Sequence, residues 1–278
     1  MGIFSDSGPG PYEYESIRGH TVLIYGKGLY KDMSAEVAPQ GIAQDVVTLS
    51  IGIPLLLISL FFSRKGSLKG RFLLAGTLGY FLVTYLFYTV MGMYNVLFLG
   101  YVLLLSASFF AFALTMSSLN IEHLHACFNQ ATPVKFVGGF LLFNAIAIAL
   151  LWLSIIIPPL VSGTIVPLEA AHYTTLIVQG LDLGILLPLA FLSGVLFIKK
   201  RPFGFLLAPV YIIFLSILMT ALTAKVIAMS LMGANVIPAA IIIPLFNVIA
   251  ILCSFLLLRH IDEPEWSERH VAYRQSHL

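Results

Sequence analysis

Long apolar stretches alternate with short polar segments along most of this chain. About 20 apolar residues in a helix cross the ~30 Å hydrocarbon core of a bilayer, and seven stretches reach that length. The predicted transmembrane helices are residues 43–63, 70–94, 96–119, 136–160, 171–198, 203–231 and 235–259. The pattern therefore predicts an all-α membrane protein with seven transmembrane helices.

The polar ends divide the chain into three parts. We interpret residues 1–42 as a cap outside the membrane, 43–259 as the helix bundle and 260–278 as a cytoplasmic tail. The cap contains an apolar run at 21–25, which predicts a short strand packed on the bundle. A disordered tail with an apolar patch is the alternative for these residues.

The composition agrees with a membrane protein. Hydrophobic residues make up 59% of the chain and charged residues only 10%, whereas soluble domains average about 25% charged residues. The net charge of +2 gives no indication of a nucleic-acid partner, and the two cysteines provide no disulfide framework. We therefore expect membrane lipids as partners and a location in the plasma membrane, the cytoplasmic membrane of a prokaryote.

Basic residues gather on one side of the predicted bundle. Eleven lysines and arginines fall in or beside the segments that follow the first, third, fifth and seventh helices, whereas three precede the first helix. Cytoplasmic loops carry an excess of Lys and Arg. The asymmetry predicts an N-terminus outside and a C-terminus in the cytoplasm. No signal-peptide pattern opens the chain, so we expect the first membrane helix to direct insertion.

One sequence pattern recurs in the first and fifth helices. Each has glutamine and aspartate before a proline, Pro54 or Pro188, and then a Leu/Phe-rich half, a basic turn and the tetrapeptide Phe-Leu-Leu-Ala. Because these two helices run in the same direction, the pattern predicts a parallel 3+1+3 repeat with the fourth helix as linker. Chance similarity between two apolar helices that end at a basic turn is the alternative.

This plan resembles in topology the SWEET and semiSWEET sugar transporters, and more loosely the rhodopsins. The resemblance is to the number, direction and grouping of the helices. It does not extend to a retinal site, because rhodopsins carry their Schiff-base lysine in the last helix, whereas Lys225 lies in the sixth.

Few ionisable residues lie within the apolar stretches, and three of them are candidates for function. A charge at bilayer depth costs at least about 2.5 kcal/mol, so such residues usually face a cavity or a partner. The predicted helices place Asp45 near the outer end of the first, Asp182 near the middle of the fifth and Lys225 in the outer half of the sixth. These positions predict an outward-facing polar cavity that narrows toward Asp182. The predicted ligand- or ion-binding residues are Asp182, Asp45, Lys225, Gln179, Gln44 and Thr48.

Each charged residue also has a structural interpretation. Asp45 can stabilise the start of the first helix through the helix dipole, and Lys225 can extend to the lipid headgroups. Asp182 is too short to reach either surface, so it must pair, bind a proton or face water. An ion pair between Asp182 and Lys225 is the main structural alternative to a functional site.

Two functions from different classes fit these features. The first is transport of a small solute or ion, with Asp182 as a carboxylate that binds the solute or exchanges a proton. The second is a seven-helix sensor that binds a ligand under the N-terminal cap. Short cytoplasmic loops leave little surface for a signalling partner, which favours transport. An accessory subunit of a membrane complex and a homo-oligomer stay open as further alternatives.

Chemistry other than binding has little support in the sequence. His123, His125 and Cys127 follow the third predicted helix and are of residue types that bind zinc, but a fourth ligand is not evident. The chain has no glycine-rich phosphate loop and no Ser/His/Asp set at membrane depth. We therefore expect no metal and no cofactor, and the sequence does not indicate an enzyme.

Overall fold

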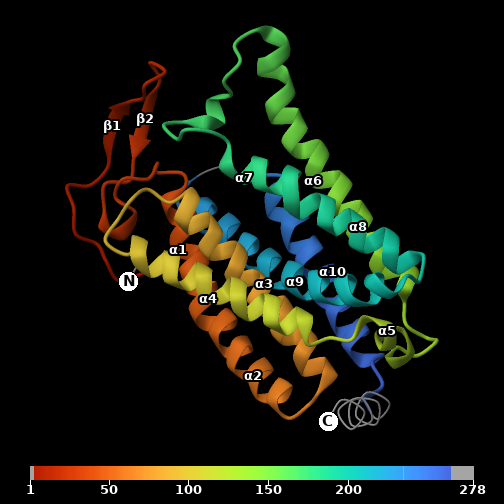
Figure 1. Cartoon of the computed structure of the whole chain (residues 1–278). Coiled ribbons are helices and arrows are strands. Elements are labelled where there is room, and N and C mark those ends of the chain that lie inside the picture. Colours follow the sequence, from red (N-terminus) through yellow and green to blue (C-terminus); the bar gives the residue numbers. More distant parts are fainter. Residues whose placement is uncertain (1–2, 234, 264–278) are drawn as a thin grey trace.

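Seven long helical spans build the protein. The computed structural model describes residues 3–233 and 235–263 (Figure 1). Within these residues, seven helical spans are long and apolar enough to cross a membrane. Five are the single helices α3 (Leu68–Val90), α4 (Phe98–Ser117), α6 (Val134–Ser162), α9 (Pro202–Leu231) and α10 (Ala239–Arg259), and a short helix, α5 (Ile121–Leu124), precedes α6. The prediction of seven apolar helices typical of a multipass membrane protein is confirmed.

The first and fifth spans are each interrupted by one wide, π-helical turn. The first consists of α1 (Ala38–Val47), the turn η2 (Thr48–Gly52) and α2 (Ile53–Arg64), and the fifth of α7 (Ile177–Leu181), the turn η5 (Asp182–Leu186) and α8 (Leu187–Ile198). Pro54 and Pro188 occupy the first turn of the helix that follows. Because proline cannot donate the helical hydrogen bond, the wide turn accommodates it without a break in the span.

The observed helix ends change the depth of both acidic residues. The first span begins at Ala38 instead of residue 43, because Pro39 lies in the first turn, where its missing N–H needs no partner. Asp45 therefore lies about two turns inside the helix and not at its end. The fifth span begins at Ile177 instead of residue 171, because the preceding residues form a loop. Asp182 therefore lies in the second turn of its span, not near the middle as predicted.

The helices α3 and α9 form the centre of the bundle. In its most apolar stretch α9 has 78% of its residues buried, compared with 56% for α3 and 28% or less for every other span. The helix α9 packs against α1, α3, α8 and α10. Gly76 permits the close approach of α3 and α9, because a Cβ there would contact the side chain of Ile213 and the carbonyl oxygen of Val210.

We expect Gly76→Val to lower the melting temperature of the purified protein. The added side chain would force α3 away from α9, and overpacking of a core costs about 1–3 kcal/mol. Gly100→Val is the matched control, because a Cβ at Gly100 on α4 meets no atom within 4 Å. Equal melting temperatures of the two variants would contradict the close packing at Gly76.

The described residues before α1, at 3–37, form an N-terminal segment that folds over one end of the bundle (Figure 1). Its strands β1 (Tyr12–Glu15) and β2 (Thr21–Ile24) pair antiparallel, with Tyr12 opposite Ile24. Tyr30 and Met33 of this segment pack with Ala38 in a small hydrophobic cluster at the start of α1.

One arginine joins the N-terminal segment to the other half of the chain. The guanidinium of Arg18 donates hydrogen bonds to the carbonyl oxygens of Ala171 at 3.2 Å, Tyr173 at 2.8 Å and Thr174 at 3.1 Å. These carbonyl groups belong to the loop between α6 and α7. The segment therefore bridges the starts of both broken spans.

Candidate functional site

A cavity of about 300 Å³ lies among α1, α3, α6, α9, α10 and the turn η5. Its volume is at the lower end of the range for small-molecule sites. Apolar side chains form much of the lining, and Tyr30, Met33 and Val37 contribute from the N-terminal segment. The polar side chains that line the cavity are Tyr30, Gln40, Gln44, Thr84, Tyr88, Asn95, Tyr101, Asn144, Trp152, Asp182, Tyr211 and Lys225.

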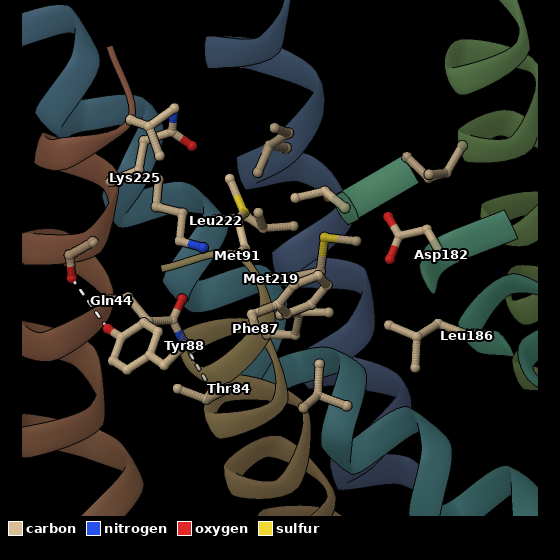
Figure 2. A pocket seen from close by; sticks show the side chains of 18 of the residues that line it. Gln44, Thr84, Phe87, Tyr88, Met91, Asp182, Leu186, Met219, Leu222 and Lys225 are labelled. Atoms are coloured by element: carbon tan, nitrogen blue, oxygen red, sulfur yellow. Dashed lines mark hydrogen bonds between the residues drawn. The ribbon is translucent and has the colours of Figure 1, made fainter. Parts of the chain in front are cut away.

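Asp182 is the acidic residue of this cavity. It is the first residue of η5, and Figure 2 shows its carboxylate on one side of the cavity. The Nε1–H of Trp152 on α6 donates a hydrogen bond of 2.8 Å to the Asp182 Oδ2. The other carboxylate oxygen has no hydrogen-bond partner in the part of the chain that the structure describes. The helix α6 thus orients the carboxylate and leaves one oxygen for further contacts.

Lys225 extends into the same cavity from α9. Figure 2 shows its ammonium group and the Asp182 carboxylate on opposite sides, with the side chain of Met219 between them in this view. Among the described residues Lys225 forms no ion pair. The two charged groups are therefore not held together as a direct ion pair, which was the main structural alternative for them.

Gln44 lines the cavity on the side of Lys225, as Figure 2 shows. Its Nε2 donates hydrogen bonds to the Tyr80 hydroxyl at 2.8 Å and to the Thr84 hydroxyl at 3.0 Å. Its Oε1 is buried and has no partner within residues 3–233 and 235–263. Thr48 also bonds the Tyr80 hydroxyl, at 2.8 Å, but it does not line the cavity. Thr48 thus supports the tyrosine that orients Gln44.

Asp45 has a different environment from the one predicted. Its Oδ2 accepts a hydrogen bond of 2.9 Å from the Tyr30 hydroxyl, and its Oδ1 accepts one of 2.8 Å from the Tyr88 hydroxyl. Burial and the adjacent Asp45 carboxylate raise the pKa of the Tyr30 phenol above its usual range, so Tyr30 stays a hydrogen-bond donor. Asp45 is not among the lining residues, and its contacts fasten the N-terminal segment to α1 and α3.

The structure brings together three of the six predicted site residues. Gln44, Asp182 and Lys225 line one cavity, whereas Asp45, Thr48 and Gln179 do not. Gln179 lies on α7, before the wide turn that begins at Asp182. Val178, the residue before it on α7, lines the cavity instead.

Two further polar residues of the cavity, Asn144 and Trp152, were not predicted from the sequence. Both lie on α6, which was interpreted only as a linker. Asn144 is 1% exposed, and its Oδ1 has no hydrogen-bond partner in the described part of the chain. Their spacing of eight residues places them on the same face of a helix, about two turns apart, and this spacing is the signal that could have identified them.

The segment with His123, His125 and Cys127 lies at the end of the bundle away from the N-terminal segment (Figure 1). Within the described ranges, no group of three or more His, Cys, Asp or Glu side chains could hold a metal ion. The Cys127 thiol donates to the His123 carbonyl oxygen at 3.5 Å, and the His125 ring packs edge-on against Phe205. These side chains contribute to local packing.

No protein-family model matches the chain, and neither the search of curated proteins nor that of solved structures finds a match. A function for the cavity therefore follows only from its geometry and chemistry.

Proposed function

We propose that the protein carries a small solute or ion across the plasma membrane through this cavity, with Asp182 as the carboxylate that binds the solute or exchanges a proton. One observation carries the proposal: an acid and a base face the same cavity without forming an ion pair among the described residues. Each charge is costly at bilayer depth unless a proton, water or a solute compensates it. Such an arrangement is typical of a binding site and not of a packed core.

The N-terminal segment lies outside the membrane in this proposal, and the loops after α2 and α8 lie in the cytoplasm. Basic residues support this orientation, because Arg64, Lys65, Lys199, Lys200 and Arg201 flank these two loops. The cavity then opens toward the outside, below the N-terminal segment that contributes Tyr30 to its lining. Residues 264–278 lie outside the described part, so the cytoplasmic tail stays a prediction.

Cysteine labelling tests this orientation. In a variant without the two native cysteines, Ser7→Cys is expected to react with a membrane-impermeant maleimide added to intact cells, because Ser7 is exposed in the N-terminal segment. Ala131→Cys, exposed in the loop before α6, is expected to react only after the membrane is permeabilised. Labelling in the reverse order would contradict the orientation and the depth assigned to Asp182.

Two parallel three-helix units explain the matched features of the broken spans. Each unit has a wide turn, a proline after it and a lysine as the C-cap of the helix that follows. The corresponding residues of the two units are all 134 positions apart: Thr48 and Asp182, Pro54 and Pro188, Lys65 and Lys199. The middle helices α3 and α9 pack against each other and against both helices of their own unit. An experimental structure in which the two units pack their helices in different orders would contradict the repeat.

The repeat suggests how the cavity could open on both sides of the membrane. Asp182 and Gln44 belong to different units, so movement of one unit against the other changes the distance between the cavity walls. The wide turns η2 and η5 are suited to act as hinges, because π-helical turns are irregular points within helices that often occur at functional sites.

A sensor is the second candidate, and one observation favours it. The N-terminal segment itself contributes Tyr30 and Met33 to the cavity, so a bound ligand would contact a part of the chain outside the membrane spans. Purified protein in sealed vesicles distinguishes the two functions. A transporter accumulates or exchanges a labelled solute that also stabilises the protein against heat, whereas a sensor binds the same solute without moving it.

A further inference from the structure

The charges on the two walls of the cavity restrict the solute that fits it. Lys225 is the only lysine or arginine that lines the cavity, and Asp182 is the only acid, within the described residues. Their charged groups lie on opposite sides of the cavity (Figure 2). A solute with a single charge would neutralise one wall and be repelled by the other, and a neutral solute would leave both charges without a partner.

Two amide oxygens add acceptors to this site. Gln44 is 4% exposed and Asn144 is 1% exposed, and the oxygen of each side chain lacks a hydrogen-bond partner within the described ranges. Both residues line the cavity. Buried polar atoms are almost always hydrogen-bonded, so these oxygens call for a molecule that brings hydrogen-bond donors.

We infer that the solute is a small zwitterion with an ammonium group and a carboxylate group on a short apolar body. This inference rests on the proposed function, because it assigns the solute of the same cavity. The carboxylate binds Lys225 and the ammonium group binds Asp182, which leaves further N–H groups of the ammonium as donors within the cavity. Charge-assisted hydrogen bonds of this kind are stronger than those between neutral groups. The apolar lining near Met219 accommodates the aliphatic part of the solute.

Trp152 provides a direct signal for binding. The chain contains two tryptophans, and Trp152 bonds Asp182 through its indole N–H. A Trp266→Phe variant leaves Trp152 as the single tryptophan. We expect leucine or 5-aminopentanoate, added to this variant in detergent, to change its fluorescence emission to a saturating value. Trp152→Phe in the same background is the control for signals that do not come from the cavity.

Single-charge analogues test the zwitterion requirement. Isopentylamine and 4-methylpentanoate are the matched analogues of leucine, and pentylamine and pentanoate those of 5-aminopentanoate. We expect each analogue to bind at least about tenfold more weakly than its zwitterion, because one charged wall then lacks its partner. In Lys225→Met we expect the zwitterion to weaken by about tenfold or more and the amine to bind more tightly than before. In Asp182→Asn the carboxylate analogue is expected to bind more tightly than before instead.

The outcomes separate this inference from the proposed function. Analogues that bind as tightly as their zwitterions, or zwitterions that change neither Trp152 emission nor melting temperature, would overturn the zwitterion assignment. Uptake of a neutral or singly charged solute into vesicles would then still support transport. Saturable binding of a zwitterion that never enters vesicles would support the assignment and contradict transport.

Discussion

Replacing Asp182 with asparagine is expected to reduce solute uptake to the level of protein-free vesicles while the protein stays folded. Asparagine has nearly the same shape, and its oxygen can still accept the hydrogen bond from Trp152 Nε1, which is 2.8 Å long in the structure. The variant loses only the charge and the ability to exchange a proton. A hydrogen bond to a charged group contributes about 1.5–3 kcal/mol, so binding alone should weaken by roughly 10- to 100-fold.

The measurement is uptake into reconstituted vesicles together with the melting temperature of the same preparation. Trp152→Phe is the matched control, because it removes the donor to the carboxylate and keeps the charge. It should reduce uptake less than Asp182→Asn does. Full uptake by Asp182→Asn would show that the carboxylate is dispensable and would contradict its assigned function.

Asp45→Leu is expected to cause a large loss of stability, in contrast to Asp182→Asn, which is expected to stay folded. The leucine removes the acceptor of the short hydrogen bonds from Tyr30 and Tyr88 and leaves only the longer contacts of Tyr30 with Tyr88, at 3.4 Å, and of Tyr88 with the Gly41 carbonyl oxygen, at 3.3 Å. A hydrogen bond to a charged group contributes about 1.5–3 kcal/mol, and both tyrosines lose such a bond at once. The melting temperature should fall, and amide hydrogen exchange in the N-terminal segment should increase, because Tyr30 fastens this segment to α1.

A compensating variant separates the lost hydrogen bonds from other effects of Asp45→Leu. Combining it with Tyr30→Phe and Tyr88→Phe removes the two hydroxyl groups that lost their charged acceptor, and exchange of hydrogen-bond partners for apolar groups can be nearly neutral. The melting temperature should therefore recover in part. If Asp45→Leu alone melts at the same temperature as the unmodified protein, the hydrogen bonds of Asp45 do not stabilise the attachment of the N-terminal segment.

The spans of the bundle could be predicted from the sequence because membrane helices have a local signal. Apolar length alone identified all seven, and the positions of most helix ends were close to those observed. The ends that were wrong depend on features that hydropathy does not measure. The first helix begins earlier than predicted because Pro39 fits its first turn. The loop before Ile177 is apolar enough to resemble a helix.

The site could be predicted only in part, for a different reason. Lys225 and Asp182 were identified because a charge at bilayer depth is rare and costly. The roles of Asp45 and Trp152 depend on contacts with Tyr30 and Asp182, which come from other segments of the chain. Such contacts are set by how the helices pack, and neither spacing nor composition within one helix indicates them.

The accessibility of the cavity to a reagent in water tests most directly the claim that this cavity is the solute site. In a variant without native cysteines, Met219→Cys places a thiol in the cavity lining, and Ile217→Cys places one on the same helix outside it. The two positions are matched, since both residues are 4% exposed. If the cavity is open to water and solute, a small cationic methanethiosulfonate reagent added to the vesicles modifies Met219→Cys and leaves Ile217→Cys unmodified. Equal reactivity of the two cysteines, or none at either, would contradict the assignment of this cavity as the solute site.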